Sequence, residues 1–187
     1  MRKALYFLGI LSDTDIEWII RNGVKTRLPA NTILIHQGRA TDSLFFVLDG
    51  EFDVFTKMAP SIAVLKAGEI VGEISFVDSL PPTASVKARM DSLVGAIPRH
   101  LMASKLKEDT GFASRFYRAM AMFMADRLRT TVGNLGKSAL EPEDETYDET
   151  MDPEMDDTDE VMPHLMDNIS IAGARFSEMQ RRSWGGR

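Results

Sequence analysis

The most constraining feature of this sequence is a region, residues 26–97, in which apolar residues come in short runs separated by turn-forming residues. The runs occupy residues 32–35, 43–48, 52–55, 62–65, 86–88 and 93–97. Glycine, proline or asparagine stands in most of the intervals, and these residues favour tight turns. Strands this short, repeated about every ten residues, are typical of an antiparallel barrel or sandwich. The middle of the chain is therefore predicted to be a β domain.

Helical spacing flanks this region on both sides. Residues 4–22 repeat apolar positions at helical spacing, and Ser12 followed by Asp15 is typical of the capped start of a short helix. After the last strand the helical pattern returns, with a break at residues 109–111 between two helices. The second of these helices is predicted to run from about residue 112 to residue 131. We therefore expect N-terminal helices, a mainly β barrel and two C-terminal helices.

The helix predicted over residues 112–131 is apolar on more than one face, because Phe116, Tyr117, Met120 and Phe123 crowd together. A helix that is apolar nearly all round must be covered on two sides. The barrel can cover one of them. For the other side we expect a homodimer through residues 112–131, and a lid formed by the end of the chain is the alternative.

Charge divides the chain more sharply than its net value of −6 suggests. Residues 1–137 contain 18 Lys and Arg against 14 Asp and Glu, whereas residues 138–187 contain 4 against 14. Twelve of these acids lie between Glu141 and Glu160 with no basic residue among them. Such a block repels itself and cannot bury apolar area. The sequence thus predicts a domain over residues 1–137, an acidic disordered linker over residues 138–162 and a tail over residues 163–187.

The tail mixes apolar residues with the basic pair Arg181 and Arg182 and with Trp184. It can dock onto a protein partner, fold back onto its own domain, or stay disordered. The sequence leaves these alternatives open, although Trp184 favours docking because a large indole is costly to leave exposed to water.

Several function classes are disfavoured by residues that are missing. The chain has no cysteine, so it has no disulfide, thiolate nucleophile or cysteine-based zinc site. No apolar run approaches the ~18 residues of a membrane span, and the N-terminal apolar stretch lacks a signal-peptide cleavage site. His36, His100 and His164 have no acid or hydroxyl partner at catalytic spacing. We therefore expect a cytoplasmic protein that is not an enzyme and has no membrane span.

The glycine-spaced string LPANTILIHQGRATDSLFFVLDGEFDVF, followed by LKAGEIVGEISFVDSLPPTASVKA, carries a specific resemblance. It resembles the cyclic-nucleotide-binding domain of catabolite-activator-type transcription factors, protein kinase regulatory subunits and gated channels. The similarity covers about residues 5–131. The positions that agree include Pro29, Gly38, Asp42, Gly50 and the group Gly68, Gly72 and Glu73. This resemblance implies a double-stranded β-helix, or jelly-roll, barrel.

In that family the segment matching residues 72–86 is the phosphate-binding cassette. The resemblance implies a short helix after Gly72, whose free N–H groups attract the cyclic phosphate, and a carboxylate of Glu73 that accepts from the ribose 2′-hydroxyl. It also implies an arginine for the phosphate and a small hydroxyl residue after it. The implied ligand is cAMP, cGMP or another cyclic nucleotide. The candidate ligand-binding residues are Gly72, Glu73, Ile74, Ser75, Pro82, Thr83 and Ala84.

The chain departs from the family at the arginine position, where Pro82 stands after Pro81, while Thr83 occupies the small-hydroxyl position. No basic residue lies between Lys66 and Lys87. Losing a charge-assisted contact to phosphate typically lowers affinity about a hundredfold or more, so any binding of cAMP is predicted to be weak. Lys87 and its neighbour Arg89 follow in a strand and are expected to point away from the pocket. The alternative role for Glu73 is to cap the cassette helix.

The end of the chain argues against DNA as a partner. Transcription factors of this kind follow the long helix with a basic DNA-binding module, whereas residues 138–187 are acidic and would be repelled by DNA phosphates. We therefore predict a non-enzymatic sensor that binds its ligand in residues 72–86 and passes the signal through the long C-terminal helix. The alternative is a degenerate domain that binds no nucleotide and serves as a scaffold for dimerisation or protein interaction.

Overall fold

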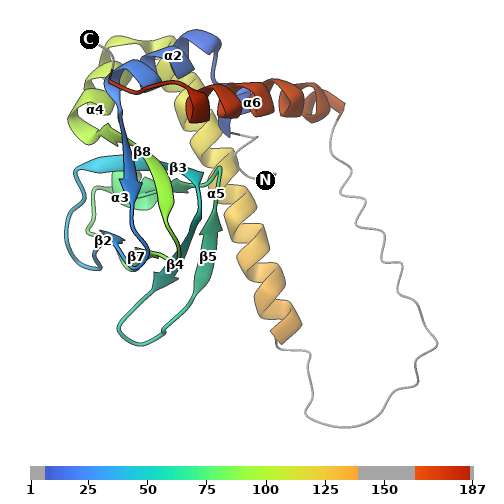
Figure 1. Ribbon diagram of the computed structural model, residues 1–187. Helices are drawn as coiled ribbons and strands as arrows, with labels where there is room; N and C mark the ends of the chain where they lie inside the picture. The colour runs from blue at the N-terminus through green and yellow to red at the C-terminus, as the bar shows by residue number, and fades with distance from the viewer. Residues whose placement is uncertain (1–6, 139–162, 186–187) are drawn as a thin grey trace.

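The strands form two four-stranded antiparallel sheets in a computed structural model that describes residues 7–138 and 163–185 (Figure 1). The first sheet has the order β1-β8-β3-β6 and the second the order β2-β7-β4-β5. The strands are β1 (Val24–Leu28), β2 (Ile33–Ile35), β3 (Ser43–Asp49), β4 (Glu51–Phe55), β5 (Ala63–Lys66), β6 (Ile70–Val71), β7 (Ser85–Ala88) and β8 (Ser92–Pro98). The predicted mainly β jelly-roll is confirmed, with two facing sheets in place of one closed barrel.

The two sheets pack face to face through a cluster of buried apolar side chains. Alternation along each strand supplies it, because successive side chains point to opposite faces of a sheet. In β4, for example, Phe52 and Val54 are buried while their neighbours are partly exposed. The cluster contains Ile35, Val47, Phe52, Val54, Leu65, Val71, Val86, Ala88 and Val94.

Helices cover the outer face of the β1-β8-β3-β6 sheet (Figure 1). Residues 7–10 are helical, and α2 (Asp13–Asn22), α4 (Arg99–Glu108), α5 (Thr110–Ser138) and α6 (Pro163–Arg181) follow, with the short α3 (Glu73–Asp78) between the strands. Strand β3 serves both cores, since Leu44, Phe46 and Leu48 face the helices while Val47 faces the other sheet. A second core thus lies between the helices and the β1-β8-β3-β6 sheet. It joins the helices to the sheet whose strand β6 leads into α3.

Helix α5 begins where the sequence predicted and ends later than predicted. Asp109 separates it from α4, and the Asp109 Oδ1 accepts a hydrogen bond of 2.8 Å from the backbone N–H of Phe112. The predicted end at residue 131 is wrong, because the helix continues to Ser138. Gly133 lies inside the helix, where a glycine costs only about 1 kcal/mol relative to alanine and does not end it.

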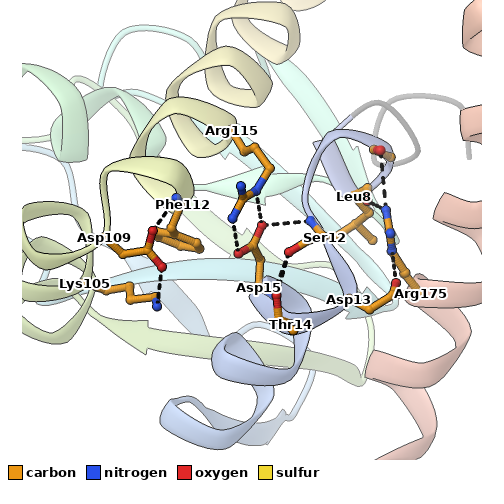
Figure 2. A network of polar contacts seen from close by, with 11 residues as sticks. Leu8, Ser12, Asp13, Thr14, Asp15, Lys105, Asp109, Phe112, Arg115 and Arg175 are labelled. Carbon is orange, nitrogen blue, oxygen red and sulfur yellow. Dashed lines mark hydrogen bonds and ion pairs between the residues drawn. The ribbon is translucent and has the colours of Figure 1, made fainter.

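A bidentate ion pair ties α5 to α2 (Figure 2). Ser12 caps α2 as predicted, and the structure adds a reciprocal capping box, in which the Ser12 hydroxyl accepts from the N–H of Asp15 and the Asp15 carboxylate accepts from the N–H of Ser12. The same carboxylate accepts from Arg115 Nε at 2.6 Å and Nη2 at 2.8 Å. Burial acts to raise the pKa of Asp15, but the hydrogen bonds from Arg115 and Ser12 outweigh it and hold this pKa below its ordinary value of 3.8. The charged form is therefore the stable one.

Candidate functional site

The segment that contains the predicted site residues lies between β6 and β7 and begins with a glycine in a conformation that other residues avoid. Gly72 has φ +89° and lies directly before α3. A Cβ at this position would approach the carbonyl oxygen of Ser43 to 3.3 Å in addition to the backbone strain. The short helix after Gly72 that the resemblance implied is thus present, and the first side chain of that helix is Glu73.

The carboxylate of Glu73 is buried and is bound by an arginine from the far end of the domain. Its side chain is 4% exposed, and its Oε1 accepts a hydrogen bond of 2.5 Å from Nη1 of Arg127 in α5. Burial raises the pKa of Glu73, while the Arg127 charge and the backbone amides of residues 72–74 act to lower it. Glu73 therefore links the start of α3 directly to the long C-terminal helix.

The other predicted residues of α3 differ in exposure. Ser75 is buried, and its carbonyl oxygen accepts a hydrogen bond of 2.7 Å from Nη1 of Arg99. Ile74 is 51% exposed and turns part of its side chain to the surface. Of the predicted site residues in α3, Glu73 and Ser75 are therefore buried and make polar contacts. Ile74 is an apolar residue at the surface.

The second half of the segment, residues 79–84, contains neither helix nor strand and leads into β7. The carbonyl oxygen of Pro82 accepts a hydrogen bond of 2.8 Å from the N–H of Gly38, which fixes Pro82 against the β2–β3 connection. Thr83 is exposed, and Ala84 packs against the core between the sheets. Thr83 therefore places a hydroxyl-bearing side chain at the surface, next to Pro82.

Positive charge reaches α3 from two arginines, Arg99 and Arg127, that lie after residues 66–87 in the sequence. Arg99 is the first residue of α4 and places its guanidinium 5.4 Å from the ring centre of Phe76. Arg127 lies 54 positions after its partner Glu73. No local motif could have revealed either contact, because both depend on how the C-terminal helices pack on the sheet.

The two basic residues that follow the segment point elsewhere, as expected from their place in β7 and beyond. Lys87 Nζ lies 5.7 Å from the ring centre of Phe55 on β4. Arg89 forms ion pairs with Glu51 at 3.3 Å and with Asp53 at 3.4 Å. These contacts occupy both cations on the surface of the β2-β7-β4-β5 sheet.

Within residues 7–138 and 163–185 no group of three or more His, Asp or Glu side chains is arranged to hold a metal ion. No helix in these same segments combines the length and the apolar composition needed to cross a membrane.

Two facing antiparallel sheets with a helical insertion between β6 and β7 define a small β domain, and known proteins share this architecture. The family model "Cyclic nucleotide-binding domain" matches residues 25–109. A cyclic nucleotide-binding domain from Methylobacillus flagellatus superposes with a TM-score of 0.66 at 19% identity, covering 76% of this chain and 85% of that one. The c-di-GMP-responsive regulator CLP of Xanthomonas campestris superposes with a TM-score of 0.61 at 18% identity, covering 70% and 66%.

A relative found by sequence is a much longer protein than this chain. An uncharacterised NTE-family protein of Mycobacterium tuberculosis is 28% identical over 126 residues, which is 66% of this chain and 22% of the relative. This chain therefore spans about a fifth of the length of that relative.

Residues 25–109 match the model of the cyclic nucleotide-binding domain family, in agreement with the resemblance seen in the sequence. Domains of this family are typically regulatory and non-enzymatic. In the part of the chain that the structure describes after α5, no DNA-binding module is present, since α6 packs on the domain itself.

Proposed function

We propose that this chain is a non-enzymatic sensor in which a cyclic-nucleotide-type anion binds at residues 72–86 and changes the position of α5. The observation that carries the proposal is the direct bond between Glu73 and Arg127. A ligand hydroxyl that donates to the Glu73 carboxylate competes with or rearranges the Arg127 guanidinium. Binding at the start of α3 is thereby coupled to the long helix.

The ligand chemistry follows from the groups that surround the segment. Glu73 offers an acceptor for a ribose hydroxyl, and Thr83 offers an exposed hydroxyl donor. Arg127 supplies positive charge from α5, although the cassette itself holds none. The family supports cAMP or cGMP as ligands, and the name of the Xanthomonas relative adds c-di-GMP. Because Pro82 replaces the expected arginine, binding is weak in this proposal.

Calorimetric titration with cAMP, cGMP and c-di-GMP tests the site. Glu73→Ala is expected to weaken binding about tenfold or more, because it removes hydrogen bonds to a charged acceptor. Pro82→Arg is expected to strengthen binding of cAMP about a hundredfold, because it restores a charge-assisted contact to phosphate. Asp78→Asn, an exposed carboxylate of the same helix, is the matched control and is expected to leave affinity unchanged. The sensor proposal fails if the wild type shows neither heat nor thermal shift at millimolar ligand and Pro82→Arg binds none either.

The second candidate function, dimerisation, rests on a separate observation on α5. Its inner face buries Phe112, Phe116 and Phe123, whereas Leu128 is 65% exposed and Val132 is 58% exposed. Tyr117, also exposed, lies three helical turns before Leu128 and therefore on the same side of the helix. This apolar stripe supports the homodimer through the long helix as a proposal.

Light scattering is expected to report a mass near twice the 20.9 kDa of the chain. Leu128→Glu is expected to yield monomer, because it places a charge in the apolar stripe. Thr130→Glu adds the same charge to the opposite side of α5 and is expected to leave the dimer intact. A wild type that stays monomeric at high concentration excludes the dimer.

A further inference from the structure

Helix α6 and the residues after it return to the domain and lie beside α2, against the sheet of β1, β8 and β3 (Figure 1). The side chains of residues 170–185 have an amphipathic pattern of burial. Ala172 and Met179 are fully buried, and Phe176 between them is partly buried against the same core. Trp184, after the end of the helix, is also buried. The sequence left open where this segment goes, and in the structure it occupies a groove formed by α2, β1, β3 and β8.

The groove contains a socket for the indole of Trp184. A Cβ on Gly95 of β8 would lie 2.2 Å from the indole, and a Cβ on Gly23 would lie 2.6 Å from it. The ring of Phe46 forms the third contact, with 6.4 Å between ring centres. The indole N–H donates to the carbonyl oxygen of Met179 in the segment itself, at 2.9 Å. Shape and apolar contact therefore select the indole, and only glycine fits at position 95 while the indole is in place.

Polar groups of the groove match the end of α6. Strand β3 shifts register against β8 between Val47 and Asp49, and the carbonyl oxygen of Leu48 at this irregularity accepts a hydrogen bond of 2.6 Å from Nε2 of Gln180. Lys25 of β1 donates through Nζ to the carbonyl oxygens of Gln180 and Arg182, the latter at 3.1 Å. A lysine at the last carbonyls of a helix also interacts favourably with its dipole.

A third contact, at the other side of the segment, fixes the direction in which α6 lies (Figure 2). Arg175 donates to Oδ1 of Asp13 at 2.7 Å and to the carbonyl oxygen of Leu8 at 2.9 Å. Asp13 is itself 87% exposed, so water can solvate it when Arg175 leaves. The groove thus binds the segment through three of its residues, Arg175, Gln180 and Trp184.

The domain does not need this segment to complete its sheets. Strands β1, β8, β3 and β6 pair with one another, and α6 adds one layer on the outside. Elements attached through one face, with few buried side chains, open at lower free energy than the core strands. Opening of α6 would expose the socket at Gly95 and leave the strand pairing of the β1-β8-β3-β6 sheet intact.

We propose that the groove of α2, β1, β3 and β8 is a docking site for an amphipathic helix followed by a tryptophan, and that residues 170–185 are its displaceable intramolecular occupant. The site recognises a helical segment by an apolar face, a C-terminal end met by Lys25, and an indole in the socket at Gly95. The proposal is independent of nucleotide binding at Glu73, so the two stand or fall separately.

Fluorescence anisotropy of a labelled peptide of residues 163–187, added to the full-length chain, tests the proposal. The peptide is expected to bind the Trp184→Ala chain, whose own segment is weakened, at least tenfold more tightly than the wild type. A tethered segment competes at an effective concentration on the order of millimolar, which keeps the wild-type groove occupied. The same peptide carrying Trp184→Ala is expected to lose at least tenfold in affinity.

Substitutions in the socket distinguish docking from nonspecific adhesion. Adding Gly95→Ala to the Trp184→Ala chain is expected to abolish peptide binding, because the new Cβ occupies the position of the indole. Gly133→Ala, where nothing lies within 4 Å of the new Cβ, is the matched control and is expected to leave binding unchanged. Absence of binding to the Trp184→Ala chain, or binding that ignores Gly95→Ala, overturns the proposal.

Hydrogen exchange on the wild type gives a readout that does not depend on a variant folding. The amides of residues 171–182 are expected to exchange faster than those of β3 and β8, because the segment opens without unfolding of the sheet. Equal protection of α6 and these strands would show that the segment is an integral part of the core and would overturn displaceability. A wild-type dimer that Trp184→Ala dissociates would assign the groove to the segment of a second copy and would overturn the intramolecular occupant.

Discussion

Replacing Arg115 by methionine is expected to lower the free energy of unfolding by about 3 kcal/mol at pH 7, because it leaves the buried carboxylate of Asp15 without its counter-ion. The carboxylate is 3% exposed and loses both bonds from the guanidinium. The expected loss is at the lower end for a buried pair, since Arg115 is itself 37% exposed and water reaches part of the site. Urea unfolding followed by circular dichroism measures the change.

The pH dependence of this loss has a definite sign. In the wild type the pKa of Asp15 is lowered, so its contribution to stability is full above the unfolded-state pKa and disappears as the pH falls through the folded-state pKa. In Arg115→Met, burial dominates and raises the pKa of Asp15. Protonation of Asp15 at lower pH then removes the unpaired buried charge and recovers part of the lost stability. The difference between wild type and Arg115→Met is therefore expected to shrink between pH 7 and pH 4.

Arg118→Met removes an exposed arginine from the same helix and is the control, with an expected change within about 0.5 kcal/mol. Equal losses for Arg118→Met and Arg115→Met, or a loss for Arg115→Met that grows as the pH falls, would contradict the assigned role of Asp15.

The sequence carried enough local information to predict the β domain and its helical flanks. Each predicted strand overlaps an observed one, because turn residues and alternating burial are local properties. The capped helix start at Ser12 and Asp15 is likewise a local property and is confirmed. Strands β1 (Val24–Leu28) and β6 (Ile70–Val71) were not predicted, since β1 has no apolar run and the two residues of β6 carry no periodicity.

Contacts between distant residues account for what the sequence did not reveal. Glu73 is a recognisable position, but its partner Arg127 lies in a helix whose register on the sheet is a tertiary property. The same holds for Trp184, whose indole fits only because Gly23 and Gly95 lie together beneath it. The acidic linker predicted over residues 138–162 lies almost wholly outside the described residues, with Ser138 ending α5.

The Glu73–Arg127 pair is expected to respond very differently to removal of its two partners. Arg127→Met is expected to cost about 3 kcal/mol at pH 7, because it leaves a carboxylate that is 4% exposed without a counter-ion. Glu73→Gln is expected to cost about 1 kcal/mol or less, because the side chain of Arg127 is 30% exposed and can turn to water. The double variant is expected to resemble Glu73→Gln alone. Denaturant unfolding of the four proteins measures this cycle.

The direction of the pH effect follows from the raised pKa of Glu73, which burial causes and Arg127 opposes. A carboxyl whose pKa is higher in the folded state binds more protons there, so its ionisation lowers stability as the pH rises through that pKa. Removing Arg127 raises the pKa further, and the loss in Arg127→Met is therefore expected to be smaller at pH 5 than at pH 7. Arg129→Met, an exposed arginine two positions along α5, is the control and is expected to change neither stability nor its pH dependence.

The same variants also distinguish the two functional hypotheses, a sensor that responds to a ligand and a scaffold that binds no nucleotide. If Glu73 serves a ligand hydroxyl and transmits binding through Arg127, then a cyclic nucleotide that binds the wild type alters hydrogen exchange along α5, and Arg127→Met removes this response while leaving a binding site at Glu73. If the pair only fastens α5 to the domain, Arg127→Met and Arg115→Met loosen α5 alike and no nucleotide changes its exchange. Equal costs for Arg127→Met and Glu73→Gln would contradict both roles, because they would mean that the buried carboxylate does not depend on its arginine.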